Sequence, residues 1–241
     1  MARAQVDRRR AVKRFYKEAR VRPGPDGGEV VLDERPVKTP ARQTLALPTE
    51  ALARAVAAEW NAQGEEVRPR TMPLTGLANA AIDRVAPDPE AFAAGLARYG
   101  EGDLLCYRAE APAALVARQA AAWDPILGWA RRRFDVNFEV TEGIIHKPQP
   151  ANTIVQLAQA VAARDPFELA ALSPLVTISG SLVIALALAE EAIDLETAWA
   201  AATLDEAWQA EHWGEDEEAA ARLEARRVEF EAAERFLRLL H

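Results

Sequence analysis

Three aspartates come nearest to an acid/base constellation in this 241-residue chain. Paired carboxylates in a cleft can act as general acid and general base, and Asp83, Asp103 and Asp124 are the candidates. Asp124 precedes a proline, and Asp83 lies near the end of a predicted helix; aspartates at such positions usually cap helices or face solvent. The residues favour structural roles. An enzyme of unknown type that uses these three carboxylates is kept as the alternative function.

The motifs for nucleotides and for nucleophilic catalysis are incomplete. Gly95 and Gly100 have the separation of a phosphate-binding loop, but Glu101 stands where that loop needs a lysine, and its carboxylate would repel a phosphate. Ser179-Gly180-Ser181 lacks the flanking glycines of a nucleophile elbow. The sequence therefore predicts neither a catalytic residue nor a cofactor.

Cysteine and histidine are too sparse for a metal site. Cys106 is the single cysteine, and it has no partner for an internal disulfide. His146, His212 and His241 are far apart and show no paired ligand spacing. We expect no structural metal.

Charge and aromatic side chains gather near the carboxyl end. Residues 205–231 hold ten carboxylates against three arginines. Aromatic rings bury much area at little entropic cost, and charges steer an oppositely charged partner, so this combination suits a protein interface. Carboxylates in the first turn of a helix also interact favourably with the positive end of the helix dipole. A cluster that only stabilises the helix is therefore an equal alternative. The predicted partner surface consists of Asp205, Glu206, Trp208, Gln209, Glu211, Trp213, Glu215 and Asp216.

The opposite end of the chain is basic. Residues 1–22 hold nine lysines or arginines and two acidic residues, although the whole chain carries a net charge of -8. A nucleic-acid adaptor would use Arg8, Arg9, Arg10, Lys13 and Arg14. The overall negative charge disfavours nonspecific nucleic-acid binding, and a solvated terminal arm is the preferred interpretation.

The elements that carry these residues divide into two kinds. In the first fifty residues, short apolar runs at 29–32 and 44–47 are bounded by turn signals, which predicts an antiparallel sheet. Leu52, Val56 and Trp60 recur at helical spacing and predict a helix over 49–63 that covers the sheet.

Helix signals dominate from residue 73 onward. The dipeptides Asp88-Pro89, Asp124-Pro125 and Asp165-Pro166 each predict the start of a helix after a corner. Alternation over 136–140 predicts a short strand or the arm of a hairpin. The uncharged stretch 169–189 is long enough to span a bilayer, but polar residues and Pro174 interrupt it, so we interpret it as a buried core helix.

The fold class is therefore α+β: a small N-terminal antiparallel β domain with a covering helix, followed by a larger all-helical bundle domain. The domain boundary is placed between residues 72 and 73, beside the proline-flanked basic segment 68–73. No secretory signal follows the basic start, so we expect a cytoplasmic protein without membrane insertion.

An ordered series of motifs then suggests a family. The motifs are Arg14–Lys17, Leu32–Pro40, Met72–Asp83, Asp103–Arg108, Trp123–Pro125 and Trp208–Asp216. In this order they resemble the assembly chaperone of the F-type ATP synthase catalytic sector that attends the alpha subunit, over about residues 12–240. Glu34 departs from the pattern, which has glycine in that turn, and puts the tightness of the hairpin in question.

The resemblance implies a non-enzyme found in α-proteobacteria and mitochondria. Such a chaperone binds unassembled alpha subunit, prevents its aggregation and yields it to the beta subunit. We expect a monomer in the bacterial cytoplasm, or in the mitochondrial matrix for eukaryotic relatives, with no nucleic-acid partner. The missing catalytic motifs and the acidic, aromatic surface agree with this reading.

Overall fold

Short antiparallel strands form the sheet of the N-terminal part. In the computed structural model, residues 12–24, 27–143, 145–214 and 216–241 are described. The strand β3 (Gly27–Leu32) pairs with β2 (Ala19–Gly24), β4 (Arg35–Pro36) and β5 (Ala46–Leu47). A separate pair joins β1 (Val12–Lys13) to β6 (Glu66–Val67). The predicted N-terminal sheet is confirmed, and Arg8, Arg9 and Arg10 lie outside the described residues.

One helix covers this sheet, as predicted. α1 (Glu50–Asn61) begins where the Thr49 side chain accepts a hydrogen bond from the backbone N–H of Leu52. Its apolar face buries Leu52 and Val56 against the sheet. A Cβ on Gly28 would lie 2.6 Å from the Cβ of Ala53, so glycine is what lets helix and strand approach this closely.

The turn between β3 and β4 is tight although glycine is absent from it. Leu32 pairs with Arg35, so Asp33 and Glu34 are the two loop residues, with φ of 45° and 75°. Positive φ at both positions matches the twist of adjoining strands in a two-residue hairpin. The Asp33 carboxylate accepts hydrogen bonds from the backbone N–H groups of Lys17 and Glu18, which anchors the turn. Glu34 therefore occupies a conformation that costs an L-residue energy.

Helices make up most of the remaining chain. They are α2 (Pro73–Ala80), which continues into a π-helical turn (Ala81–Val85), α3 (Pro89–Ala97), α4 (Ala113–Phe134), α5 (Ala151–Ala162), α6 (Pro166–Ser179), α7 (Leu182–Ala189), α8 (Leu195–Ala202), α9 (Leu204–Trp213) and α10 (Glu217–Arg238). Two-residue strands β7 (Tyr107–Arg108) and β8 (Thr141–Glu142) pair in parallel. The α+β class with a large helical part is confirmed.

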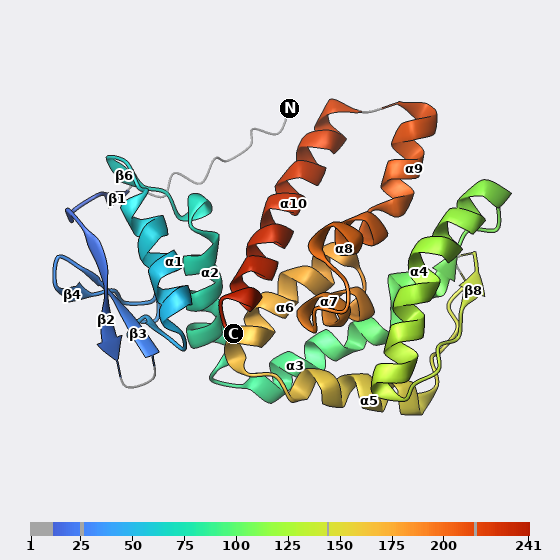
Figure 1. Cartoon of the computed structure of the whole chain (residues 1–241), viewed down its shortest axis with the longest axis horizontal. Coiled ribbons are helices and arrows are strands. Elements are labelled where there is room, and N and C mark those ends of the chain that lie inside the picture. Colours follow the sequence, from blue (N-terminus) through green and yellow to red (C-terminus); the bar gives the residue numbers. More distant parts are fainter. Residues whose placement is uncertain (1–11, 25–26, 144, 215) are drawn as a thin grey trace, which may run out of the picture.

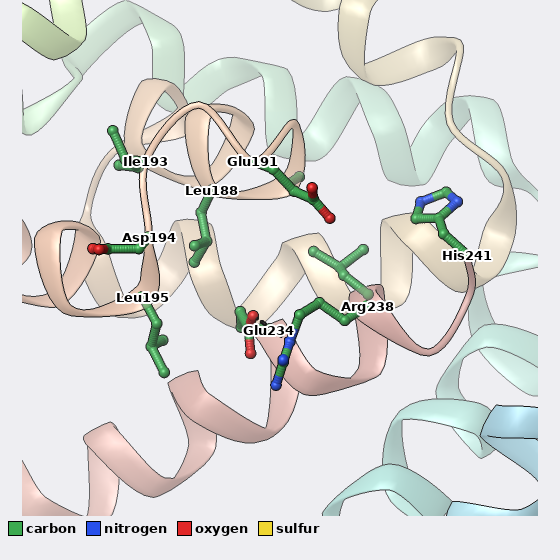
Figure 2. A pocket seen from close by; sticks show the side chains of 10 residues that line it. Leu188, Glu191, Ile193, Asp194, Leu195, Glu234, Arg238 and His241 are labelled. Carbon is green, nitrogen blue, oxygen red and sulfur yellow. Dashed lines mark ion pairs between the residues drawn. The ribbon is translucent and has the colours of Figure 1, made fainter.

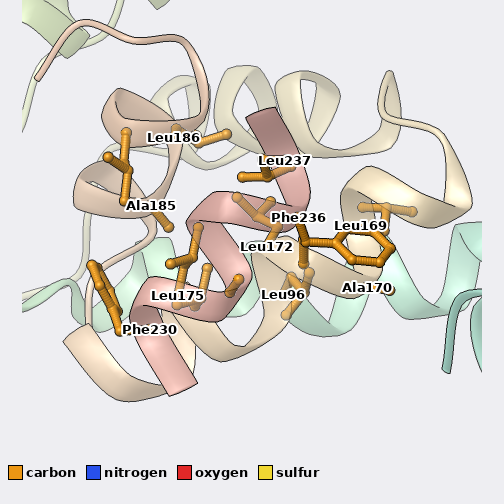
Figure 3. Close-up of a cluster of buried hydrophobic side chains, with 14 of the residues drawn as sticks. Leu96, Leu169, Ala170, Leu172, Leu175, Ala185, Leu186, Phe230, Phe236 and Leu237 are labelled. Carbon is orange, nitrogen blue, oxygen red and sulfur yellow. The ribbon is translucent and has the colours of Figure 1, made fainter. Parts of the chain in front are cut away.

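The centre of the helical part is α6 and α7. Every residue from Leu182 to Leu188 is buried, and α6 is apolar on most of its surface. Phe230, Phe236 and Leu237 of α10 pack onto this pair (Figure 3). The stretch 169–189 is therefore buried as predicted, but as two helices that break at Gly180, whose φ is +67°. None of the helices within the described residues meets the length and apolarity needed to cross a bilayer.

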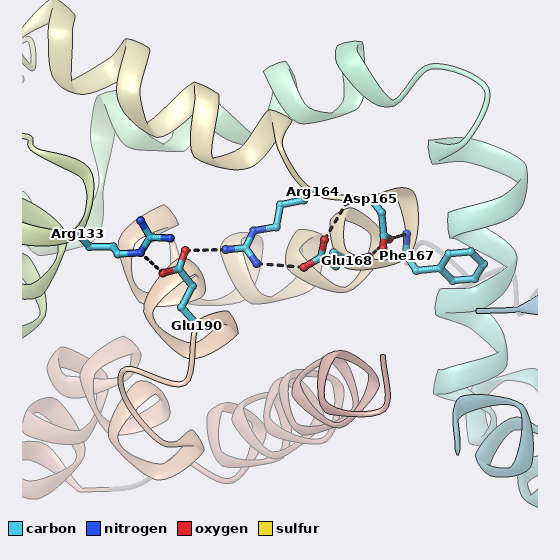
Figure 4. Close-up of polar contacts among 6 residues, drawn as sticks. All are labelled: Arg133, Arg164, Asp165, Phe167, Glu168 and Glu190. Atoms are coloured by element: carbon cyan, nitrogen blue, oxygen red, sulfur yellow. Dashed lines mark hydrogen bonds and ion pairs between the residues drawn. The ribbon is translucent and has the colours of Figure 1, made fainter. Parts of the chain in front are cut away.

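A charged network fastens the outer helices to this centre (Figure 4). Glu190, at the end of α7, accepts hydrogen bonds from Arg133 of α4 and, at 3.0 Å, from Arg164. Arg164 also pairs with Glu168 at 3.1 Å. The Asp165 side chain caps α6 reciprocally with Glu168, which confirms the start predicted at Asp165-Pro166. Because Arg164, Glu168 and Glu190 are largely buried, water and salt screen these pairs little.

The predicted helix start at Asp124-Pro125 is wrong. Pro125 lies inside α4, which runs unbroken from Ala113 to Phe134. Proline removes one backbone hydrogen bond there, at a cost of about 3 kcal/mol. Burial of Trp123, Ile126 and Leu127 on either side of it offsets that cost.

The strand predicted over 136–140 is also absent from the described structure. Val136 and Phe138 are buried as the alternation suggests, but side chains take the place of a partner strand. Gln149 both donates to and accepts from the backbone of Glu139, and Thr153 does the same for Asn137. Extended backbone can therefore satisfy its polar groups without a sheet.

The domain boundary between residues 72 and 73 stays a prediction. Several polar contacts cross it: Glu59 accepts hydrogen bonds from the backbone N–H groups of Leu74 and Thr75, and Thr49 donates to the Leu239 carbonyl. The two parts are thus in contact, whether they fold as one domain or as two.

Replacing Glu34 by glycine should stabilise the protein. The change relieves a non-glycine residue at positive φ, and we expect the free energy of unfolding to rise by about 1 kcal/mol in urea denaturation. The control is Glu34→Ala, which removes the same carboxylate but keeps the backbone cost. Equal effects of the two substitutions would show that charge, not backbone conformation, is responsible.

Candidate functional site

The predicted partner surface lies on α9 and the start of α10. Gly214, with φ of +88°, ends α9, so Asp216 belongs to the next helix, where its side chain accepts a hydrogen bond from the backbone N–H of Ala219. Glu215 lies outside the described residues. Figure 1 shows α9 and the first half of α10 rising above the layer formed by α6 and α7. Leu204 is the one buried residue of α9.

On one side, α9 is held to α4 by polar contacts. Both carboxylate oxygens of Glu211 accept hydrogen bonds from Arg118, at 2.9 and 2.7 Å. Asp205 accepts one from the Gln119 amide at 2.8 Å. The hydrogen bond from Arg118 lowers the pKa of Glu211 below its usual value. Both carboxylates already have partners within the chain.

On its other side, α9 faces α10. Glu206 pairs with Arg226 at 3.0 Å, and Arg226 also donates to the Ile178 carbonyl at the end of α6. This arginine therefore connects α9, α10 and the central layer. The charge-rich surface predicted from sequence is in part a set of internal ion pairs.

The two tryptophans of the surface differ in exposure. Trp208 stacks on His212 at 4.1 Å between ring centroids, and the Arg118 guanidinium lies 6.0 Å from the Trp208 ring. Trp213 is 78% exposed. A single exposed apolar ring is common on protein surfaces, so what Trp213 indicates depends on the apolar side chains beside it.

A groove of about 450 Å³ separates α9 from α10 beside Trp213. Its apolar lining consists of Ala210, Trp213, Ala219, Ala220 and Leu223, and its polar lining of Glu206, Gln209, Asp216, Arg222 and Arg226. Sequence reasoning missed the residues of α10 in this set. Ala219 and Leu223 belong to the apolar stripe of the last helix, but that stripe meets the core fully only from Phe230 onward.

The three aspartates of the alternative function are occupied elsewhere. Asp83 accepts hydrogen bonds from the Thr39 hydroxyl and the backbone of Ala41, which ties the sheet region to the helices. Asp124 pairs with Arg108 at 2.7 Å. Each carboxylate has its own set of protein partners, so the contacts give no support to a shared acid/base site.

Asp103 is the buried member of the three. It accepts hydrogen bonds from the Ser181 hydroxyl at 2.7 Å and from the backbone N–H groups of Val183 and Leu105 at 3.0 Å each. Asp103 therefore holds the start of α7 against the 3₁₀ turn Leu104–Cys106, which directly follows Asp103 in the chain. Complete burial raises its pKa to about 6, against the opposing effect of those donors.

A second cavity lies between the end of α7, the start of α8 and the end of α10 (Figure 2). Its volume is about 370 Å³, and Leu188 and Ile193 line it together with Glu191 and Glu234. Burial raises the pKa of Glu234, and Arg238, 2.6 Å away, opposes that shift. The pair is satisfied internally. Across the described part of the chain, no cluster of His, Cys, Asp and Glu is arranged to hold a metal ion.

Comparisons with known proteins agree with the fold and the motifs. A family model, the ATP12 chaperone protein, matches residues 13–131. The crystal structure of Atp12 from Paracoccus denitrificans is 46% identical, with a TM-score of 0.91 over 95% of this chain and 99% of that one. A structure of an aspartate-to-lysine mutant of the Atp12p from the same organism matches with the same identity and TM-score, over 98% of its length. The mitochondrial protein atp12 of Schizosaccharomyces pombe is 26% identical over 221 residues, which are 86% of this chain and 75% of the relative.

The buried Asp103 predicts a pH dependence of stability. Its folded-state pKa of about 6 lies above the unfolded value of 3.8, so the folded state takes up the proton first and this group's contribution to stability rises as pH falls through 6. Relative to Asp103→Asn, the wild-type free energy of unfolding should rise by about 1 kcal/mol between pH 7.5 and 5.5. A pH-independent difference in urea denaturation would show that burial does not raise this pKa.

Proposed function

Since this chain belongs to the ATP12 chaperone protein family, we propose that it is an assembly chaperone that binds the unassembled alpha subunit of ATP synthase. It prevents aggregation of that subunit and yields it to the beta subunit. It acts as a monomer, in the bacterial cytoplasm or, for eukaryotic relatives, in the mitochondrial matrix.

The observation that carries this proposal is the projecting pair of α9 and the first half of α10. It combines dense negative charge with an exposed tryptophan and an apolar groove, and these features serve recognition more readily than folding. An unassembled subunit exposes the interface meant for its neighbour and aggregates unless that interface is covered. A mixed polar and apolar surface covers it reversibly, as handover requires.

A client must compete with the internal ion pairs of this surface. Glu211 and Glu206 are each paired in the free chain, so a basic group of the client must compete with Arg118 or Arg226. Exposed pairs of this kind contribute about 1 kcal/mol or less, so the competition costs little. The acidic surface can therefore exchange its own arginines for those of a client.

The proposed function predicts suppression of client aggregation. Alpha subunit diluted from urea should scatter less light when an equimolar amount of this protein is present, and ATP should not be needed. The reason is that the exposed beta-facing surface of the client is covered. The same turbidity with and without the protein would contradict the proposal.

A charge swap separates client contact from internal pairing at Glu211. Glu211→Lys places a lysine against Arg118, while the double variant Arg118→Glu with Glu211→Lys restores an ion pair of reversed polarity. If Glu211 contacts a basic client, both variants should capture alpha subunit at least tenfold more weakly than wild type. Melting temperatures should change little, because exposed substitutions alter stability by about 0.5 kcal/mol.

The matched control is the exposed pair of Glu50 and Arg54 on α1, whose swap should leave capture unchanged. Wild-type capture by the Glu211 double variant would assign a structural role to this pair and move the client contact elsewhere.

A further inference from the structure

We propose that the groove between α9 and α10 receives an apolar side chain of an alpha-subunit segment that carries lysine or arginine on either side of it. This inference rests on the proposed function and adds the chemistry of the segment that is bound. The groove is the anchor, and the surrounding carboxylates select the flanking cations.

The groove is open because its walls are small. Ala210 on α9 and Ala219 and Ala220 on α10 present only methyl groups, so the two helices do not fill the space between them. Leu223 forms the half-buried inner wall and joins the core, while Trp213 stands at the outer edge. A folded protein without a partner for this groove leaves an apolar surface in water, which is unfavourable.

Size restricts what enters. A volume of about 450 Å³ is near the lower end of the range for ligand sites, which suits one or two large side chains and not a whole element. An amphipathic helix or an extended segment delivers side chains in this way. Trp213 lines the groove with a ring that is 78% exposed, so it can contact such a side chain.

Charge restricts what lies beside the anchor. Among the described residues 204–226, the carboxylates are Asp205, Glu206, Glu211, Asp216, Glu217, Glu218 and Glu224, and the arginines are Arg222 and Arg226. Arg226 is paired with Glu206 at 3.0 Å. Arg222 lies 3.4 Å from Glu218 and 3.9 Å from Asp216, so it is itself engaged. A segment with flanking lysines or arginines complements this surface, whereas an acidic segment would be repelled.

Two neighbouring alanines on α10 provide the test. Ala220 lines the groove, whereas the exposed Ala221 does not. Ala220→Lys and Ala221→Lys add the same charge to the same helix turn, but only the first puts a side chain into the groove. The probe is alpha subunit diluted from urea, and the readout is the chaperone concentration that halves light scattering.

We expect Ala220→Lys to raise that concentration at least tenfold, and Ala221→Lys to change it less than twofold. Equal values for the two variants would overturn the groove as the anchor, while wild-type suppression would leave the proposed function standing. Failure of wild type to suppress scattering would refute the proposed function and this inference together.

A second variant guards against a folding defect. If Ala220→Lys lowers the melting temperature, Trp213→Ser takes its place, because a residue that is 78% exposed contributes little to the core. We expect Trp213→Ser to raise the half-suppression concentration at least fivefold, with unchanged melting. Unchanged suppression by this variant would overturn the proposed anchor.

Discussion

The structure depends on one apolar helix that must be covered on every side. α7 buries every residue from Leu182 to Leu188, so it needs neighbours all around it. α6, α4, α8 and the second half of α10 supply them, and Glu190 and Asp103 fix the two ends of α7 by charged and polar contacts. The apolar faces of these surrounding helices are therefore buried against α7. α9 and the first half of α10 lie outside this packing, held mainly by ion pairs and hydrogen bonds.

The apolar core and the surface proposed to bind the client therefore lie in different parts of the chain. The central layer of α6 and α7 stabilises the fold by burying apolar area. The projecting pair of α9 and the first half of α10 contributes little to that stability. This pair exposes a tryptophan and an alanine-lined groove. Two of its carboxylates, those of Glu211 and Glu206, pair with Arg118 and Arg226. Under the proposed function, a client with basic groups would replace those arginines without disturbing the core.

Residue patterns predicted the sheet, its covering helix and the helical remainder because these follow from local periodicity and turn chemistry. They failed where tertiary contacts overrule local signals: Pro125 stays inside α4 because Trp123 and Ile126 are buried beside it, and 136–140 finds side-chain partners instead of a strand. The acidic residues and tryptophans of α9 were visible in the sequence. Their pairing with Arg118 and Arg226 was not, since those arginines come from other helices, and neither was the groove, which needs two helices placed side by side.

Hydrogen–deuterium exchange of this protein, free and bound to alpha subunit, tests the central claim most directly. If α9 and the first half of α10 bind the client, exchange in residues 204–213 and 217–228 should slow on binding, because both would be covered. Exchange in α1 and α7 should stay the same, because neither takes part in the proposed interface. Protection confined to other elements, with α9 and α10 exchanging as fast as in the free protein, would contradict the account.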